Sequence, residues 1–308
     1  MFGKMHWMRN NAILAILFGF MCASGLAPQT VHMFGESQPV HLRSSYKTVG
    51  SNTTETGELR GAATRASARS MLLDIVTRNL DVRDGQLFQD VPVWQLPNSE
   101  VFFFVSGMTI DADGAPNAYS PDDTGLDELA NAGGPSRWNG IITGRDGDPL
   151  IQQERDPFPG YYISCTSLSD ETKQFDEPAR YVDASKIPYV ALPKDLADWG
   201  GARLGDFAVV LNLRNGKSSF AIYADIGTLG EGSVALADSL GIQSDARLGG
   251  EADGILYLLF PGSGNLRPRT IGEIQHEGEK LLLYHWRGMK KPSSSPISDA
   301  PSVARGDL

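Results

Sequence analysis

The chain has 308 residues, of which 41% are hydrophobic and 21% charged, a composition typical of a globular protein and not of a disordered one. Its formal net charge of −10 argues against a nucleic-acid partner, because phosphate groups repel an acidic surface. Only two cysteines are present, Cys22 and Cys165, so a disulfide-built scaffold is excluded.

Residues 1–27 predict a signal peptide. Lys4 and Arg9 supply positive charge, residues 12–21 are apolar, and small residues near Ala27 offer a cleavage site. The apolar stretch is short for a membrane span, which needs about 20 residues. We therefore predict a secreted protein, extracellular or periplasmic, with no membrane contact after cleavage. An uncleaved anchor is the alternative.

Two polar segments flank a single predicted domain. Residues 28–80 are rich in Ser, Thr and Gly at first and predict a flexible linker, with a short helix over residues 63–80 where apolar residues recur at helical spacing. Residues 289–308 are rich in Ser and Pro and predict a disordered tail. The folded domain is expected over residues 81–288.

Short apolar runs of strand length recur through this domain, with Gly, Pro, Asn and Asp turns between them. Asn215-Gly216 separates two of these runs and predicts a hairpin. We predict a mainly β fold, a compact six-stranded, double-psi-like β-barrel with elaborated loops and a few short helices. The predicted strands cover residues 91–94, 101–105, 161–163, 187–192, 207–213, 219–224, 255–260 and 281–284.

Two acidic residues follow the central hairpin. Asp225 ends its second strand, and Glu231 follows in a glycine-rich loop. Ser233 is a good N-cap for a short helix, and Gly241 is placed to end it. Such a pair suits a glycosidase, in which one carboxyl group protonates the leaving oxygen and the other activates water. The alternative is structural, because acids are common at strand ends and near helix N-termini.

This stretch resembles the signature of family 75 of the glycoside hydrolases, the fungal-type chitosanases. In that family a strand ends in Gly-Asp-Thr, and Gly-Glu-Ala-Ser opens a helix. The counterparts here are residues 224–226, Ala-Asp-Ile, and residues 230–233, Gly-Glu-Gly-Ser. Residues 108–115 are similar to the family's Met-Asp-Ile-Asp-Cys-Asp-Gly-Ala, and residues 160–164 resemble bacterial-type relatives. The resemblance spans residues 93–264.

The resemblance implies an endo-acting chitosanase that cleaves β-1,4-linked glucosamine polymers with inversion and without a cofactor. It implies Asp225 and Glu231 as the catalytic pair. Burial of Asp225 favours the role of general acid, and the helix after Glu231 favours the role of base. We expect a monomer whose partner is a polysaccharide such as chitosan. The alternatives are a hydrolase or lyase on another wall polysaccharide, such as peptidoglycan, and a non-catalytic carbohydrate-binding barrel.

Asp111-x-Asp113-Gly114 begins like a calcium-binding EF-hand loop. Pro116 stands where that loop needs glycine, and Asp122 stands where it needs glutamate, so we predict no metal. We expect Asp111 and Asp113 to bind substrate; a plain Asp-Gly turn is the alternative.

Two aromatic residues lie in polar loops. Tyr119 and Trp138 are candidates for stacking on sugar rings. Burial in the core is the alternative for both, because large aromatic side chains dominate protein cores.

Overall fold

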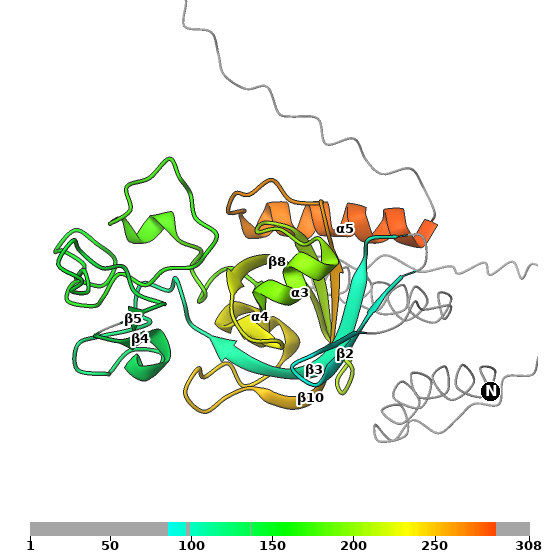
Figure 1. The fold of residues 1–308 in the computed structure, drawn as a ribbon, viewed down its shortest axis with the longest axis horizontal. Coiled ribbons are helices and arrows are strands. Elements are labelled where there is room, and N and C mark those ends of the chain that lie inside the picture. The colour runs from blue at the N-terminus through cyan, green and yellow to red at the C-terminus, as the bar shows by residue number, and fades with distance from the viewer. Residues whose placement is uncertain (1–85, 97–98, 136, 288–308) are drawn as a thin grey trace, which may run out of the picture.

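The computed structural model describes residues 86–96, 99–135 and 137–287 (Figure 1). The signal peptide, the linker with its helix and the tail expected from the sequence lie outside these residues. Within the described residues, no helix has the length and apolar character needed to cross a membrane.

The described domain is mainly β, as predicted, with few helices (Figure 1). Its strands are β1 (Gln86–Phe88), β2 (Val91–Gln95), β3 (Phe102–Asp111), β4 (Gly133–Gly134), β5 (Arg137–Trp138), β6 (Tyr189–Leu192), β7 (Phe207–Asn212), β8 (Ser218–Ile226), β9 (Glu231–Ser233) and β10 (Glu251–Phe260). Its α-helices are α3 (Lys194–Gly200), α4 (Val234–Leu240) and α5 (Ile271–Arg287), and its 3-10 helices are η1 (Leu129–Ala132) and η2 (Pro178–Arg180).

Six strands close into a barrel in the order β3-β10-β7-β8-β6-β9, and β9 pairs back onto β3. This confirms the predicted six-stranded barrel. Two pairings, β3–β9 and β6–β8, are parallel, and the others in the barrel are antiparallel. β1 and β2 extend the sheet from β3. Closure leaves the barrel strands with hydrogen-bond partners on both sides.

The predicted hairpin is present. β7 and β8 pair antiparallel, and Leu211 lies opposite Ser218 at the turn. Gly216 has a φ of +74°, a left-handed conformation that glycine adopts without steric cost. The Asn215 side chain accepts a hydrogen bond from the backbone of Lys217, which closes the turn.

The barrel interior is filled by alternate residues of the strands. Phe104 and Tyr257 stack there with ring centroids 4.7 Å apart. α4 contacts five of the six strands, so it covers one end of the barrel, and its Leu236 and Leu240 join the interior cluster. Val190, Val210, Tyr223 and Ile255 belong to the same cluster.

Helix α5 covers part of the outer face, and its apolar residues Ile274, Leu281 and Leu282 pack there. Gly278 lets the helix approach closely, since a Cβ at this position would lie 2.4 Å from the Phe220 ring. The strand predicted over residues 281–284 is therefore wrong. Residues 274, 281 and 282 share one helical face, and this longer period outweighs the short apolar run.

A lobe of long loops, residues 112–188, connects β3 to β6 and lies beside the barrel (Figure 1). The strand predicted over residues 161–163 is absent from this lobe, which instead forms isolated bridges such as Ile151 with Tyr162. Pro157, Pro159 and Gly160 just before it limit extended pairing. Apolar residues of the lobe, including Leu168 and Val182, pack in one cluster with residues of the barrel's outer face.

Candidate active site

Asp225 and Glu231 lie on either side of one short strand. β6 runs between β8 and β9, and its Ala191 pairs with Asp225 on one side and with Glu231 on the other. Residues paired across neighbouring strands point to the same face of a sheet. The two acidic residues therefore face the same side, separated by two strand spacings, or about 9.6 Å between Cα atoms.

A β-bulge gives Asp225 this orientation. Val190 pairs with Tyr223, whereas the next residue, Ala191, pairs with Asp225, so Ala224 is the extra residue. In a regular strand, Asp225 would point to the same side as Tyr223, which is the barrel interior. The bulge instead places it on the outer face, beneath the loop lobe.

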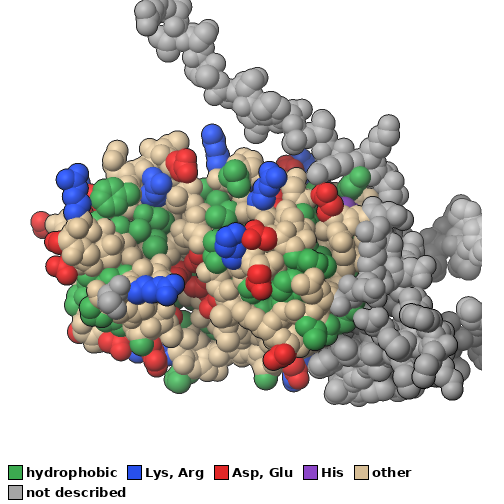
Figure 2. Space-filling model, viewed as in Figure 1, with side chains coloured by type: hydrophobic (Ala, Val, Ile, Leu, Met, Phe, Trp, Pro, Cys, Tyr) green, Lys and Arg blue, Asp and Glu red, His purple; other side chains and the backbone are tan. Residues whose placement is uncertain are grey.

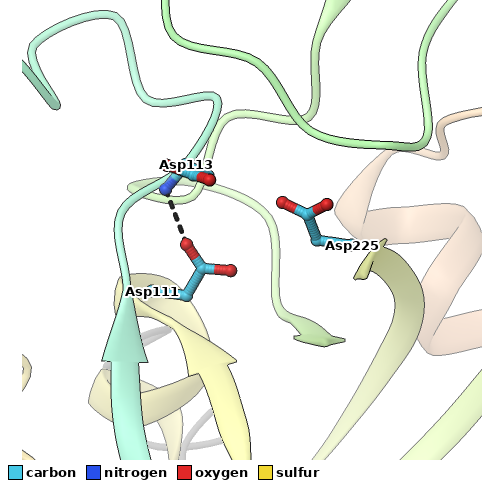
Figure 3. A group of neighbouring side chains, drawn as sticks. All are labelled: Asp111, Asp113 and Asp225. Atoms are coloured by element: carbon cyan, nitrogen blue, oxygen red, sulfur yellow. Dashed lines mark hydrogen bonds between the residues drawn. The ribbon is translucent and has the colours of Figure 1, made fainter. Parts of the chain in front are cut away.

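Asp111 and Asp113 reach the same place from β3. Thr109 pairs with Glu231, and Asp111, two residues further along, projects from the same face. The Asp113 backbone N–H donates to Asp111 Oδ1 over 2.8 Å. Oxygen atoms of Asp111, Asp113 and Asp225 lie within 4.8 Å of one another, and Figure 3 shows the Asp225 carboxyl group pointing toward the other two.

Asp225 is 7% exposed and accepts three hydrogen bonds. The donors are the Ser167 backbone N–H at 3.0 Å, the Ser167 hydroxyl at 2.6 Å and the backbone N–H of Ile226 at 2.8 Å. Burial raises the pKa of Asp225 to about 6, and the hydrogen bonds from Ser167 and Ile226 oppose that rise.

Glu231 is half-buried, and Thr228 binds its carboxylate. The Thr228 N–H and hydroxyl donate to Oε2 at 2.7 and 3.2 Å. A Cβ at Gly227 would lie 2.1 Å from the same oxygen, so the carboxylate occupies space that is free only because residue 227 has no side chain. Burial raises the pKa of Glu231, and the hydrogen bonds from Thr228 lower it.

Ser233 caps α4 as predicted, accepting from the Leu236 N–H at 3.1 Å, and Gly241 ends that helix.

Burial also raises the pKa of Asp111 and of Asp113. The second contribution is the negative charge of Asp113 on Asp111, and of Asp225 on Asp113. A hydrogen bond from Tyr119 opposes the rise at Asp113. Carboxyl groups packed this closely do not all ionise at once, so the cluster retains protons at a pH where an exposed carboxyl group has lost its own.

The two candidate aromatic residues differ in their surroundings. Tyr119 is only 2% exposed, so its ring offers no face to a sugar, and its hydroxyl donates to Asp113 Oδ1 over 2.6 Å. Trp138 is half-buried, packs against the core and lies 6.3 Å from the Tyr162 ring between centroids. Its buried Nε1 has no hydrogen-bond partner among the described residues.

Sequence reasoning missed three residues of this site. Thr228 lies three residues before Glu231 in the glycine-rich loop, so its contact with Glu231 could have been predicted from the sequence. Ser167 is 58 residues from Asp225. Tyr189, whose hydroxyl donates to the Asp113 carbonyl oxygen at 3.0 Å, is 76 residues from Asp113. Contacts of this kind depend on barrel closure and carry no local signal.

Asp111, Asp113 and Asp225 are the described residues whose spacing could hold a cation. Calcium takes six to eight oxygen ligands, and the sequence after Asp113 departs from a calcium loop at two required positions. Protons relieve the same repulsion, so we assign no metal to this cluster.

The structure combines a closed barrel with carboxyl groups in a hollow beside a loop lobe. Figure 2 shows acidic side chains in this recess. These are features of a polysaccharide hydrolase. Residues 157–280 match the family described as fungal chitosanase of glycosyl hydrolase group 75. The match bears out the resemblance that the motifs predicted and supports a chitosanase-type glycosidase activity for this part of the chain. The matched region contains Asp225 and Glu231, whereas Asp111 and Asp113 lie before it. No curated protein matches the chain.

Proposed function

We propose that the protein is an endo-acting chitosanase that hydrolyses β-1,4-linked glucosamine polymers with inversion. The observation that supports this most directly is the pairing of both Asp225 and Glu231 with Ala191. The two strand spacings between their Cα atoms are compatible with a water molecule between the carboxyl groups. Inverting enzymes hold them roughly 6.5–9.5 Å apart, whereas retaining enzymes hold them about 5–5.5 Å apart.

In this proposal Asp225 is the general acid. Its pKa of about 6 leaves it protonated under mildly acidic conditions, where amino groups of chitosan are charged and the polymer is soluble. Glu231 is the general base, since two hydrogen bonds from Thr228 favour its ionised form. Asp225 protonates the leaving glycosidic oxygen while Glu231 takes a proton from the attacking water.

Asp111 and Asp113 bind the substrate in this proposal. Their carboxyl oxygens can accept hydrogen bonds from the ammonium and hydroxyl groups of glucosamine. Tyr119 contributes indirectly by orienting Asp113. Trp138 contributes by packing against the hydrophobic cluster that joins the loop lobe to the barrel. The protein acts as a monomer after secretion, and sequencing of the mature N-terminus tests the predicted cleavage after residue 27.

The decisive experiment measures reducing ends released from chitosan, with chitin and peptidoglycan as controls, while NMR follows the anomer formed first. Release from chitosan with the α-anomer appearing first supports the proposal. The β-anomer first would indicate retention, and release from peptidoglycan alone would indicate a different wall polysaccharide. Binding to chitosan without any release would indicate a carbohydrate-binding barrel.

A further inference from the structure

The two oxygens of Asp225 have different surroundings. Among the described residues, all three hydrogen bonds to this carboxyl group go to Oδ1, two from Ser167 and one from the Ile226 backbone. Three donors occupy the lone pairs that Oδ1 can offer. A proton on this carboxyl group therefore resides on Oδ2.

We propose that Ser167 is a positioning residue that fixes the transferable proton of Asp225 on Oδ2. The inference rests on the proposed function, in which Asp225 is the general acid. Ser167 touches the substrate in no step of it. Its hydroxyl orients the carboxyl group and keeps Oδ1 in the acceptor role, so that Oδ2 is the oxygen that donates to the glycosidic bond.

The loop around Ser167 is fixed to the strand that carries Asp225. The Leu168 N–H donates to the carbonyl oxygen of Ala224 over 2.8 Å, on the residue just before Asp225. The Thr166 hydroxyl donates to the Leu168 carbonyl oxygen at 2.8 Å and accepts from the Val182 N–H at 3.0 Å. Backbone and side-chain bonds thus hold the Ser167 hydroxyl in place.

Ser167 itself is solvent-exposed and has no role in the hydrophobic core. Its removal therefore costs little packing energy, and a change in activity would report on Asp225 and not on folding. Donors to a carboxylate stabilise its ionised form, so loss of the hydroxyl raises the pKa of Asp225.

Six titratable groups act on or lie beside Asp225: Asp111, Asp113, Cys165, Tyr189, Tyr223 and Glu231.

A matched control exists in the same lobe. The Ser185 backbone N–H and hydroxyl donate to Asp183 Oδ1 at 3.0 and 2.5 Å, which repeats the arrangement of Ser167 on a carboxyl group that is not part of the cluster of Asp111, Asp113 and Asp225. The variants to compare are Ser167→Ala, Ser167→Thr and Ser185→Ala. Threonine keeps the hydroxyl and serves as the rescue variant.

Two readouts separate the inference from the proposed function. NMR titration of the Asp225 carboxyl carbon gives its pKa without reference to activity, and the pH profile of kcat for chitosan gives the pKa of the acid in use. Ser167→Ala is expected to raise both by about one unit and to lower kcat about tenfold at the optimum. Ser167→Thr and Ser185→Ala are expected to match the parent protein.

The inference is overturned if Ser167→Ala leaves both pKa values unchanged, or if Ser167→Thr fails to restore them. A different failure is also recognisable. If the NMR pKa of Asp225 rises while the alkaline limb of the rate profile stays in place, then Asp225 is not the general acid. That result overturns the proposed function and, with it, the role of Ser167.

Discussion

Asp225 carries a charge that folding makes costly. Asp225 is nearly buried, and the negative charges of three further carboxyl groups lie near it, those of Asp111, Asp113 and Glu231. Its pKa rises from 3.8 to about 6 on folding, so the folded state holds this proton more tightly than the unfolded state. Between these two values the folded protein loses stability as the pH rises, and the loss is complete above about pH 6.

Asp225→Asn is expected to lower kcat on chitosan about a thousandfold while raising stability at pH 7 by about 2–3 kcal/mol, because the amide has no charge to bury. Rate assays and thermal unfolding between pH 4 and 8 check this, with the exposed Asp198→Asn as the control. Reduced stability at pH 7 would contradict the burial argument, and an unchanged rate would contradict the catalytic one.

Glu231→Ala is expected to lose activity that azide partly restores, since a small anion can replace a missing base but not a missing acid. Activity assays with increasing azide test this, and Asp225→Ala serves as the comparison. Rescue of Asp225→Ala alone would show that the roles of the two residues are reversed.

At the level of elements, the loop between β8 and β9 sets the position of Glu231. Thr228 holds the carboxylate, and Gly227 leaves the space that it occupies. The bulge at Ala224 sets the orientation of Asp225 on the other side of β6. The proposed catalytic pair therefore depends on backbone irregularities at two strand ends.

Gly227→Ala is expected to displace the Glu231 side chain, because the new methyl group would lie 2.1 Å from Oε2. The side chain is flexible enough to move, so we expect stability within about 1 kcal/mol of the parent and a rate at least about tenfold lower. Gly272→Ala, where a Cβ meets no atom within 4 Å, is the control. A fully active Gly227→Ala variant would show that the position of the carboxylate is not critical.

Elements with a strong local signal were predictable from the sequence. The hairpin at Asn215-Gly216 and the Ser233 and Gly241 ends of α4 follow from turn and capping chemistry alone. α5 was missed because its four-residue apolar run obscured a helical pattern that begins at Ile274. The bulge at Ala224 and the contact from Ser167 were beyond prediction, since both depend on which strands become neighbours when the barrel closes.

At the scale of the whole molecule, the proposed function pairs an acidic protein with a cationic substrate. The chain carries a formal net charge of −10, a sum that includes the carboxyl cluster of the candidate site. Opposite charges attract a polymer from a distance and hold it during repeated cleavage.

Raising the ionic strength from 0.01 to about 0.5 M should increase KM for chitosan at least severalfold, because salt shortens the Debye length from about 30 Å to below 8 Å. Steady-state kinetics at several salt concentrations check this, and kcat is expected to change less. A neutral, fully acetylated oligomer provides the control for binding. Equal salt effects on both ligands would count against charge recognition.

Removal of divalent cations is expected to leave activity unchanged, since the carboxyl cluster is assigned to proton transfer and substrate binding. Dialysis against EDTA followed by rate assays, with calcium and magnesium added back, tests this. Lost activity that one cation restores would assign the cluster of Asp111, Asp113 and Asp225 to a metal instead.

Ala191 lies between the two acids, and its side chain is a single methyl group that faces them from β6. Ala191 is 1% exposed, and a Cβ at Gly227 would lie 3.1 Å from its Cβ, so a larger residue there would collide with the β8–β9 loop that positions Glu231. The spacing of the two acids is then set by the peptide backbone, and the seat of that loop by the smallness of one side chain. In a protein of this design, a larger side chain at position 191 would lift the loop and move Glu231 without replacing either acid.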